Sequence, residues 1–306
     1  VLPRLILFFW AAFKSYYLKN RFPLPRDLIF KNTLNIALAS HTNIGKTSLL
    51  RTLVKRDVGM VSNRAHVTRK SSGYFMLNEP DARLKIWDTP GFSHVDDLMK
   101  YVLDGQLDGY LKKYIKKDPL NVEALTALKN ESDLILFLVP ALLEKAPVAS
   151  IKKELAILKT LEKPILCTVN QLDREDIQKN EASLNGWRDF FQRQGIPSDD
   201  VIPLDAHYRT MEEEALFLDK IVRLIQGESR DLAEKIRRHY RERQEVQFKK
   251  LGQIVAQSLI SLCLAHAPID EAGEEHAVKE FKKQSDRLIC DASGDIISTV
   301  GLDHDI

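Results

Sequence analysis

Three short groups of polar residues follow apolar runs of the sequence, and each has side chains suited to nucleotide chemistry. The first is SHTNIGKT at residues 40–47, between an apolar run and a helical pattern. A loop in this context binds phosphate, because backbone N–H groups and a helix N-terminus surround the anion. Lys46 adds positive charge at the β- and γ-phosphates, and the Thr47 hydroxyl is a ligand for Mg²⁺. The motif predicts a phosphate-binding loop, although Ser40 stands where the usual pattern begins with Gly.

The predicted phosphate contacts come from consecutive residues of this loop and of the helix that it opens. They are Asn43, Ile44, Gly45, Lys46, Thr47 and Ser48.

The second group is DTPG at residues 88–91, again after an apolar run. A carboxylate at the end of a strand can hold Mg²⁺ through water, which assigns Asp88 to the metal. The Gly91 N–H is expected to meet the γ-phosphate, so that loss of this phosphate on hydrolysis releases the loop.

The third group is NQLD at residues 170–173, also after an apolar run. The Asp173 carboxylate can accept hydrogen bonds from N1 and N2 of guanine, a donor pair that adenine lacks. Asn170 can meet N7 of the base and brace the phosphate loop. The order and spacing of the three groups therefore predict a guanine nucleotide site.

The elements that must position these groups alternate along the chain. Strand-like runs cover 34–39, 72–78, 83–87, 133–139, 164–169 and 201–204, and helical patterns lie near 46–56, 148–162, 181–194 and 211–226. Near-continuous apolar runs are typical of parallel strands covered on both faces, and a turn at 79–82 favours one antiparallel pair. This alternation predicts an α/β fold, a three-layer doubly wound sheet that is mostly parallel with one antiparallel edge strand.

The sequence divides into three parts by this reading. Residues 1–31 are an N-terminal extension, 32–226 the nucleotide-binding domain and 227–306 a helical C-terminal region. The stretch between Gly91 and the strand at 133 reads as extra helix, either a packing insertion or an effector surface. The apolar run 5–13 is about half of a membrane span, and it predicts either a segment that packs on the protein or one that binds a membrane surface or a partner.

Composition excludes several classes. The 306 residues have a net charge of +2, 44% hydrophobic and 29% charged residues, and three scattered cysteines. These values argue against disorder and against attachment to nucleic acid by bulk charge alone. Three separated cysteines favour free thiols over a disulfide framework or a zinc site, and free thiols favour a cytoplasmic location. The apolar run 5–13 leaves peripheral membrane association as the alternative location.

With these motifs in place, residues 32–226 resemble a P-loop GTPase of the translation-factor-related class, in its Era- and TrmE-like branch. The whole chain is similar to a bacterial GTPase family with an uncharacterised C-terminal domain. The resemblance implies that residues 57–69 form switch I, with Thr68 closing over Mg²⁺ and the γ-phosphate. It also implies that Asp205 and Ala206 form the last guanine-contacting loop, with the Ala206 N–H near O6.

Several residues depart from the family pattern. Gln171 replaces a Lys that normally lies along the base, which predicts weaker guanine binding with the choice of base preserved by Asp173. Phe92 stands where Ras-like enzymes have the Gln that orients the attacking water. Asn43 matches TrmE-like members, in which such an Asn coordinates K⁺ at the phosphates. His94 and His207 are interpreted as structural residues.

The predicted function is a Mg²⁺-dependent GTPase that acts as a molecular switch, with Lys46, Thr68 and Gly91 as its catalytic groups and with stimulation by K⁺, dimerisation or a partner. The alternative is a nucleotide-dependent binding module with little hydrolysis. The resemblance suggests RNA or the ribosome as a partner. The basic segment 230–250, which four acidic residues interrupt, is interpreted either as a solvated helix face or as a surface for phosphates. The run 5–13 suggests a membrane surface, and an unknown protein effector stays open.

Overall fold

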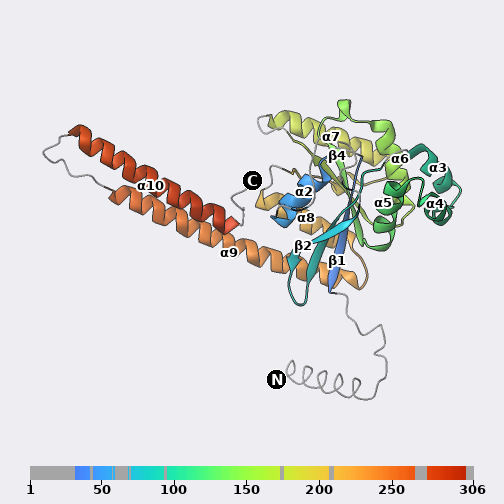
Figure 1. Ribbon diagram of the computed structural model, residues 1–306, viewed down its shortest axis with the longest axis horizontal. Coiled ribbons are helices and arrows are strands. Elements are labelled where there is room, and N and C mark those ends of the chain that lie inside the picture. Colours follow the sequence, from blue (N-terminus) through green and yellow to red (C-terminus); the bar gives the residue numbers. More distant parts are fainter. Residues whose placement is uncertain are drawn as a thin grey trace, which may run out of the picture. The chain divides into compact units, whose positions relative to one another are not determined.

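A computed structural model describes residues 32–41, 44–56, 58, 68, 70–92, 95–172, 176–206, 210–265 and 274–300. Its centre is a six-stranded sheet in the order β2-β3-β1-β4-β5-β6 (Figure 1). Neighbouring strands are parallel except β2 and β3, which are antiparallel. The strands are β1 (Thr33–Ala39), β2 (Ser72–Asn78), β3 (Arg83–Asp88), β4 (Leu134–Pro140), β5 (Ile165–Asn170) and β6 (Val201–Pro203).

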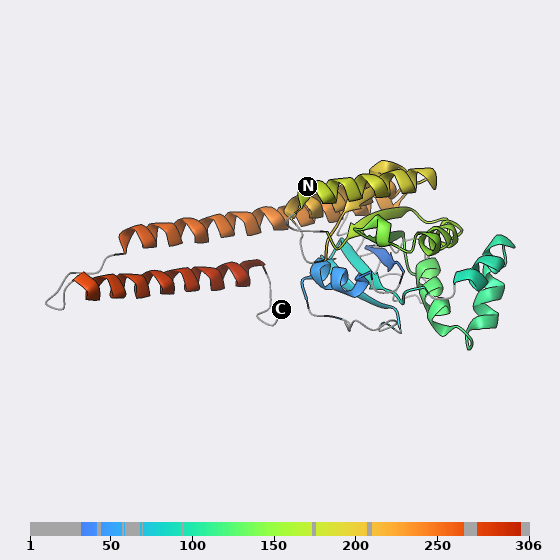
Figure 2. The ribbon, with the colours of Figure 1, turned by 90° about the horizontal axis from the view of Figure 1, so that it is seen from above.

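Helices cover both faces of this sheet (Figure 2). One face packs against α2 (Lys46–Val54), α8 (Met211–Leu224) and the first turns of α9 (Ser229–Leu264). The other face packs against α3 (Val95–Leu103), α4 (Leu107–Tyr114), α5 (Pro119–Asn130), α6 (Val148–Lys159) and α7 (Ile177–Arg193). Residues along β1 alternate between the two cores, as the two-residue period of a strand requires.

The predicted α/β fold is confirmed. The antiparallel pair arises at the predicted turn, where the Glu79 N–H donates to the Ala82 carbonyl over 3.1 Å. Each predicted strand and helix is present within a few residues of its expected bounds. The extra helix expected after Gly91 forms α3, α4 and α5, and Tyr110 anchors it as a ring that is 1% exposed.

The C-terminal helices are α9 and α10 (Glu274–Val300), which pack against each other. Apolar residues recur at helical spacing along α9, but they are buried only at its start, where Ile236 and Tyr240 belong to the same core as α2 and α8. Further along, Phe248 and Leu259 are 67% and 57% exposed. The three-part division at 31/32 and 226/227 stays a proposal, and the first turns of α9 pack as part of the nucleotide-binding domain's core.

Several predictions concern residues outside the described ranges. They are the N-terminal segment 1–31, most of switch I at 57–69, and Asn43, His94, Asp173 and His207. Of the helices that the structure describes, none combines the length and the apolar character that crossing a membrane requires.

Candidate nucleotide site

The predicted site residues gather at one edge of the sheet, because they follow the carboxyl ends of β1, β3, β5 and β6. The connection after β1 leads to β2 on one side of the sheet, and the connection after the neighbouring β4 leads to β5 on the other side, so the strand order reverses between β1 and β4. In open α/β sheets ligands bind at such a switch point, outside the carboxyl ends of the strands. The phosphate loop begins directly after β1, which places it at this point.

The three residues predicted to hold Mg²⁺ meet in the structure. Thr47 Oγ1, at the start of α2, donates to Asp88 Oδ2 over 2.8 Å, and Thr68 Oγ1 donates to the same oxygen over 3.1 Å. The two hydroxyl oxygens are 3.3 Å apart. Thr68 comes from the segment predicted as switch I, so a residue assigned from resemblance alone lies beside the two assigned from their motifs.

The free oxygen of Asp88 is the feature that points to a ligand. Asp88 is 3% exposed, and its Oδ1 atom has no hydrogen-bond partner among the described residues. Burial raises the pKa of this carboxyl, and the hydrogen bonds from Thr47 and Thr68 and the nearby Lys46 charge lower it only in part. A buried carboxylate with two hydroxyls is the hard oxygen donor set that Mg²⁺ prefers. The residues present therefore fit the metal.

Lys46 is buried beneath the phosphate loop. Lys46 is 8% exposed. Its Nζ donates to Ser40 Oγ over 2.9 Å and lies 3.5 Å from the carbonyl oxygens of Ser40 and His41. Burial lowers the pKa of Lys46, while the Asp88 and Glu154 charges oppose this shift. Ser40, the departure from the motif, thus supplies an extra hydroxyl acceptor to the lysine.

A pair that sequence reasoning missed anchors the same loop. His41 Nδ1 lies 2.7 Å from Glu154 Oε1, and the Glu154 side chain on α6 is fully buried. Its second oxygen, Oε2, has no hydrogen-bond partner among the described residues. Burial raises the pKa of Glu154, and the hydrogen bond to Glu154 raises the pKa of His41. The two residues are separated by more than one hundred positions, so no local pattern could have joined them.

Asn170 braces the phosphate loop, as predicted, and joins it to the loop after β6. Its Nδ2 donates to the Ile44 carbonyl over 2.7 Å, and its Oδ1 accepts from the Ala206 N–H over 2.8 Å. Asn170 is fully buried. Gly45 has φ +89°, and a Cβ there would lie 2.8 Å from Asn170 Nδ2. Glycine is therefore required by both the backbone conformation and the close approach of Asn170.

Asp205 is hydrogen-bonded to the backbone of the third motif. Its Oδ2 accepts from the Leu172 N–H over 2.8 Å, and the residue is 1% exposed. Gln171 is exposed with φ +65°, in the turn between Asn170 and Leu172. The resemblance assigned Asp205 to the guanine-contacting loop, and in the structure its carboxylate bonds to the loop that leads to Asp173.

The Asp-Thr-Pro-Gly turn is packed tightly at the end of β3. Thr89 Oγ1 donates to the Leu38 carbonyl of β1 over 2.6 Å, and Gly91 is buried. Phe92 forms a parallel bridge with His41 and is 1% exposed in the core with the α3–α7 helices. A buried Phe92 cannot orient a water molecule, so this position provides packing instead.

Hydrogen bonds join Thr47, Thr68 and Asp88 at one end of the predicted site, and Ile44, Asn170 and Ala206 at the other. Gly45, Lys46 and Ser48 lie in the loop and first helical turn, and Gly91, Gln171 and Asp205 follow β3, β5 and β6. Thr52 of α2 also donates to the Ala206 carbonyl, which ties the last loop to the helix that follows the phosphate loop. The positions of Asn43 and Asp173 fall outside the described residues.

Comparison with known proteins gives matches over the same segment. Residues 35–171 match the family described as 50S ribosome-binding GTPase. GTPase Der of Campylobacter jejuni subsp. jejuni serotype O:23/36 is 28% identical over 221 residues, which cover 72% of this chain and 42% of that protein. GTPase Era of Lactobacillus delbrueckii subsp. bulgaricus is 30% identical over 142 residues, or 45% of this chain and 39% of that protein.

Among solved structures, Era in complex with MgGDPNP and nucleotides 1506–1542 of 16S ribosomal RNA has a TM-score of 0.45 at 20% identity. That match covers 64% of this chain and 58% of the Era chain. The chain spans less than half the length of the curated relatives that it matches.

Proposed function

Because its nucleotide-binding segment is a P-loop GTPase domain of the Era-like class, we propose that this protein binds GTP with Mg²⁺ and hydrolyses it to GDP and phosphate. The observation that carries the proposal is the meeting of Thr47, Thr68 and Asp88, with the buried Asp88 Oδ1 left without a partner among the described residues. When bound, Mg²⁺ supplies positive charge to the β- and γ-phosphate oxygens.

The chain's own groups would divide the remaining work. Lys46 exchanges its loop acceptors for phosphate oxygens, and its desolvated charge interacts strongly with them because the site is buried. The Gly91 N–H faces the γ-phosphate. Water attacks the γ-phosphorus in line, and the bond from that phosphorus to the bridging oxygen breaks. Thr68 and Gly91 lose their partner when phosphate leaves, which lets their loops relax.

We propose that Asp173 selects guanine and that Asn170 and Asp205 fix its loop. The support is the pair of bonds from Asn170 to Ile44 and Ala206, together with the bond from Asp205 to Leu172. The test is hydrolysis and binding of GTP, ATP and XTP by the wild type and by Asp173→Asn. Xanthine has an oxygen where guanine has the 2-amino donor, so the neutral Asn is expected to shift preference from GTP to XTP. Equal use of GTP and ATP by the wild type would reject the assignment.

We also propose that K⁺ stimulates GTP hydrolysis through Asn43. The support is that an Asn stands at this position of the phosphate-loop motif. We expect GTP turnover to rise when K⁺ replaces Na⁺, and the Asn43→Ala variant to lose this difference. Turnover that is equal in the two salts would remove Asn43 from the account. Nucleotide-dependent dimerisation is tested in the same samples by sedimentation in GDP and in a non-hydrolysable GTP analogue.

A binding module with little hydrolysis is the second candidate, and the burial of Phe92 favours it. The Phe92 side chain is apolar and buried in the core, so it cannot orient the attacking water. Single-turnover hydrolysis separates the two: a module holds GTP for hours, whereas a GTPase releases phosphate within that time. If phosphate release is seen only with K⁺ or a partner, the missing water-orienting group is supplied from outside the chain.

The partner remains to be identified by experiment, and we propose RNA as the first to test. The family that residues 35–171 match is described as 50S ribosome-binding GTPase, and the solved Era complex contains a 16S rRNA fragment. In α9, however, Arg237 and Arg241 form ion pairs with Asp219, so part of the basic segment 230–250 is neutralised locally. RNA binding should fall steeply with salt. Liposome sedimentation lost on deleting residues 1–20 would instead support a membrane surface for an otherwise cytoplasmic protein.

A further inference from the structure

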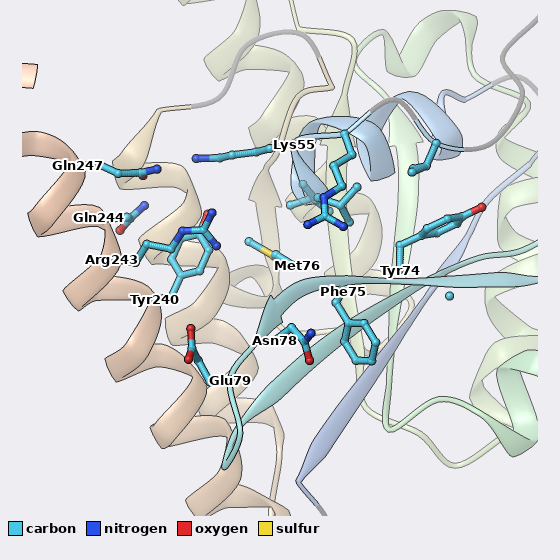
Figure 3. Close-up of a pocket in the computed structure, with 15 residues that line it drawn as sticks. Lys55, Tyr74, Phe75, Met76, Asn78, Glu79, Tyr240, Arg243, Gln244 and Gln247 are labelled. Atoms are coloured by element: carbon cyan, nitrogen blue, oxygen red, sulfur yellow. The ribbon is translucent and has the colours of Figure 1, made fainter. Parts of the chain in front are cut away.

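A groove separate from the nucleotide site runs beside β2, the outermost strand on its side of the sheet. Its volume is about 660 Å³, and it is bounded by the end of α2, by β2 and by α9 (Figure 3). Residues from three separate parts of the chain line it, among them Lys55, Met76, Tyr240 and Arg243. A hollow of this size can bury several side chains of a bound partner.

The strand that forms one wall has a free edge. Strand β2 pairs with β3 and with no second strand among the described residues. Within that described part, the backbone N–H and C=O groups along the other edge have no ladder partner, and an edge of this kind can pair with an incoming strand. The register between β2 and β3 shifts between Phe75 and Leu77, so Met76 is left without a partner residue in the pairing and lies in the wall of the groove.

The opposite wall is held in place by the core. Tyr240 of α9 is 3% exposed, and its hydroxyl donates to Glu214 of α8. One turn later, Gln244 Nε2 donates to the same carboxylate over 2.9 Å. His239 Nε2 lies 3.1 Å from Asp81 Oδ1, in the turn that joins β2 and β3. These contacts fix the helix beside the strand, so the groove has a defined width.

The rim of the groove is positively charged. Lys55 and Arg56 approach from the end of α2 and Arg243 from α9, while Glu79 is the acidic residue of the lining. Figure 3 shows Lys55 and Arg243 on the two sides of the space above Met76. Across the part of the chain that the structure describes, no salt bridge involves Arg56 or Arg243. Nearby Arg237 and Arg241, by contrast, both pair with Asp219.

We propose that this groove binds an acidic segment of a partner protein in extended conformation, added as a strand to the free edge of β2. The edge supplies main-chain hydrogen bonds, which is how sheets bind extended peptides. Met76 and Tyr240, which are 5% and 3% exposed, form the closed floor beneath the alternate side chains of the bound strand. The Arg56 and Arg243 guanidinium groups receive carboxylates. The proposal does not depend on GTP hydrolysis.

A strand fits this surface better than a nucleic acid does. Phosphate would satisfy the basic rim, but it would leave the free strand edge without hydrogen-bond partners. Of the three aromatic residues in the lining, Tyr240 is 3% exposed and Tyr74 is half-buried, so Phe75, at 38% exposed, is the one whose ring is open for a base to stack on. The groove includes Val58, whose carbonyl accepts from Arg51 Nε over 2.7 Å, so a bound strand would lie next to the segment predicted as switch I.

The full chain is used to select binders from a displayed library of random peptides. The peptides have about ten residues, which is longer than an average strand. The selected peptides are then measured by fluorescence anisotropy. One variant, Arg56→Glu with Arg243→Glu, reverses two charges of the groove. The matched control, Lys235→Glu with Arg238→Glu, makes the same charge change on the exposed face of α9 outside the groove. Thermal unfolding checks that both variants are folded.

The proposal predicts that selected sequences carry Asp or Glu at alternating positions. Affinity should fall at least about tenfold in the groove variant, and by less than about twofold in the control. N-methylation of alternate peptide amides should abolish binding in one register and be tolerated in the other, because only one edge of an added strand faces β2.

Three results would overturn it: peptides of helical or basic pattern, equal losses in the two variants, or tolerance of N-methylation in both registers. Binding of a single-stranded RNA oligonucleotide that displaces the selected peptides and depends on the same arginines would assign the groove to nucleic acid instead.

Discussion

The two ends of the nucleotide site differ in how their polar groups are satisfied. At the base end, the Asn170 amide is fully buried and bonds to Ile44 and Ala206, and Asp205 accepts from Leu172. At the phosphate end, Asp88 keeps a buried oxygen without a partner among the described residues. The polar groups named at the base end bond to the protein itself, whereas the phosphate end has a buried carboxylate oxygen that a cation can neutralise.

This difference predicts which residues stabilise the fold and which ones bind the ligand. Groups at the base end should stabilise the fold when no nucleotide is present. Groups at the phosphate end should weaken it slightly, because an unpaired buried carboxylate costs free energy that only a ligand returns.

The largest effect is expected at the phosphate end. Asp88→Asn removes the charge that we propose holds Mg²⁺ while keeping the size of the side chain, so kcat/KM for GTP should fall at least about 100-fold. The nucleotide-free protein should unfold at an equal or higher denaturant concentration, because a desolvated carboxylate is replaced by a neutral amide. Chemical denaturation and single-turnover assays measure the two quantities, and a clear loss of stability would break the contrast.

At the base end the opposite pattern is expected. Asn170→Ala leaves the Ile44 carbonyl and the Ala206 N–H buried without their partner, which should cost about 2–4 kcal/mol of unfolding free energy. Guanine affinity should fall with it. Denaturation of the nucleotide-free protein is the measurement, with Asn170→Asp as the companion that keeps one acceptor. A variant that retains full stability would show that the brace is dispensable.

Gly45 sharpens the same comparison, because it lies where the two ends meet. Gly45→Ala forces an L side chain to φ +89° and towards Asn170 Nδ2, so it should cost about 1–3 kcal/mol. Gly252→Ala, in α9 where an added Cβ meets open space, is the matched control and should be neutral or slightly stabilising. Equal effects of the two substitutions would contradict the close approach.

The smallest effect is expected at the His41–Glu154 pair. His41→Ala should lower GTP affinity by about threefold to tenfold, while His41→Asn, which keeps a donor near the Nδ1 position, should recover most of it. Nucleotide titration measures both. Equal affinities of His41→Ala and His41→Asn would show that the hydrogen bond to Glu154 does not position the loop.

The same pair predicts a dependence on pH. The folded-state pKa of His41 is raised, mainly by its hydrogen bond to Glu154, so the stabilisation from its protonated form is fully present below the unfolded pKa. This stabilisation is lost as pH rises through the folded pKa. The stability advantage of the wild type over His41→Asn should therefore shrink from acidic to mildly alkaline pH. An advantage that grows over this range would contradict the sign.

Local signals predicted most of the fold and of the site. Apolar runs predicted each strand, and the polar groups that follow them predicted Lys46, Thr47 and Asp88. Thr68 required the resemblance, because a threonine in an irregular segment has no pattern of its own. Glu154 could not be predicted: in the sequence it is one more charged residue of a helix, and only the packing of α6 reveals its burial.

The C-terminal region shows another limit of sequence reasoning. Beyond Tyr240 apolar residues recur along α9 at helical spacing from Phe248 on, although Phe248 and Leu259 are exposed where Ile236 is buried. Periodicity predicts a helix and its apolar face, but it does not tell how far a second element covers that face.

Asp88, Thr47 and Thr68 are proposed as the Mg²⁺ site of a GTPase. Single-turnover GTP hydrolysis in a Mg²⁺ titration tests this proposal, with the wild type and Asp88→Asn compared at saturating nucleotide. A Mg²⁺ site at these residues predicts Mg²⁺-dependent phosphate release by the wild type and almost none by Asp88→Asn at any Mg²⁺ concentration. Equal rates in the two proteins, or release that does not depend on Mg²⁺, would contradict it.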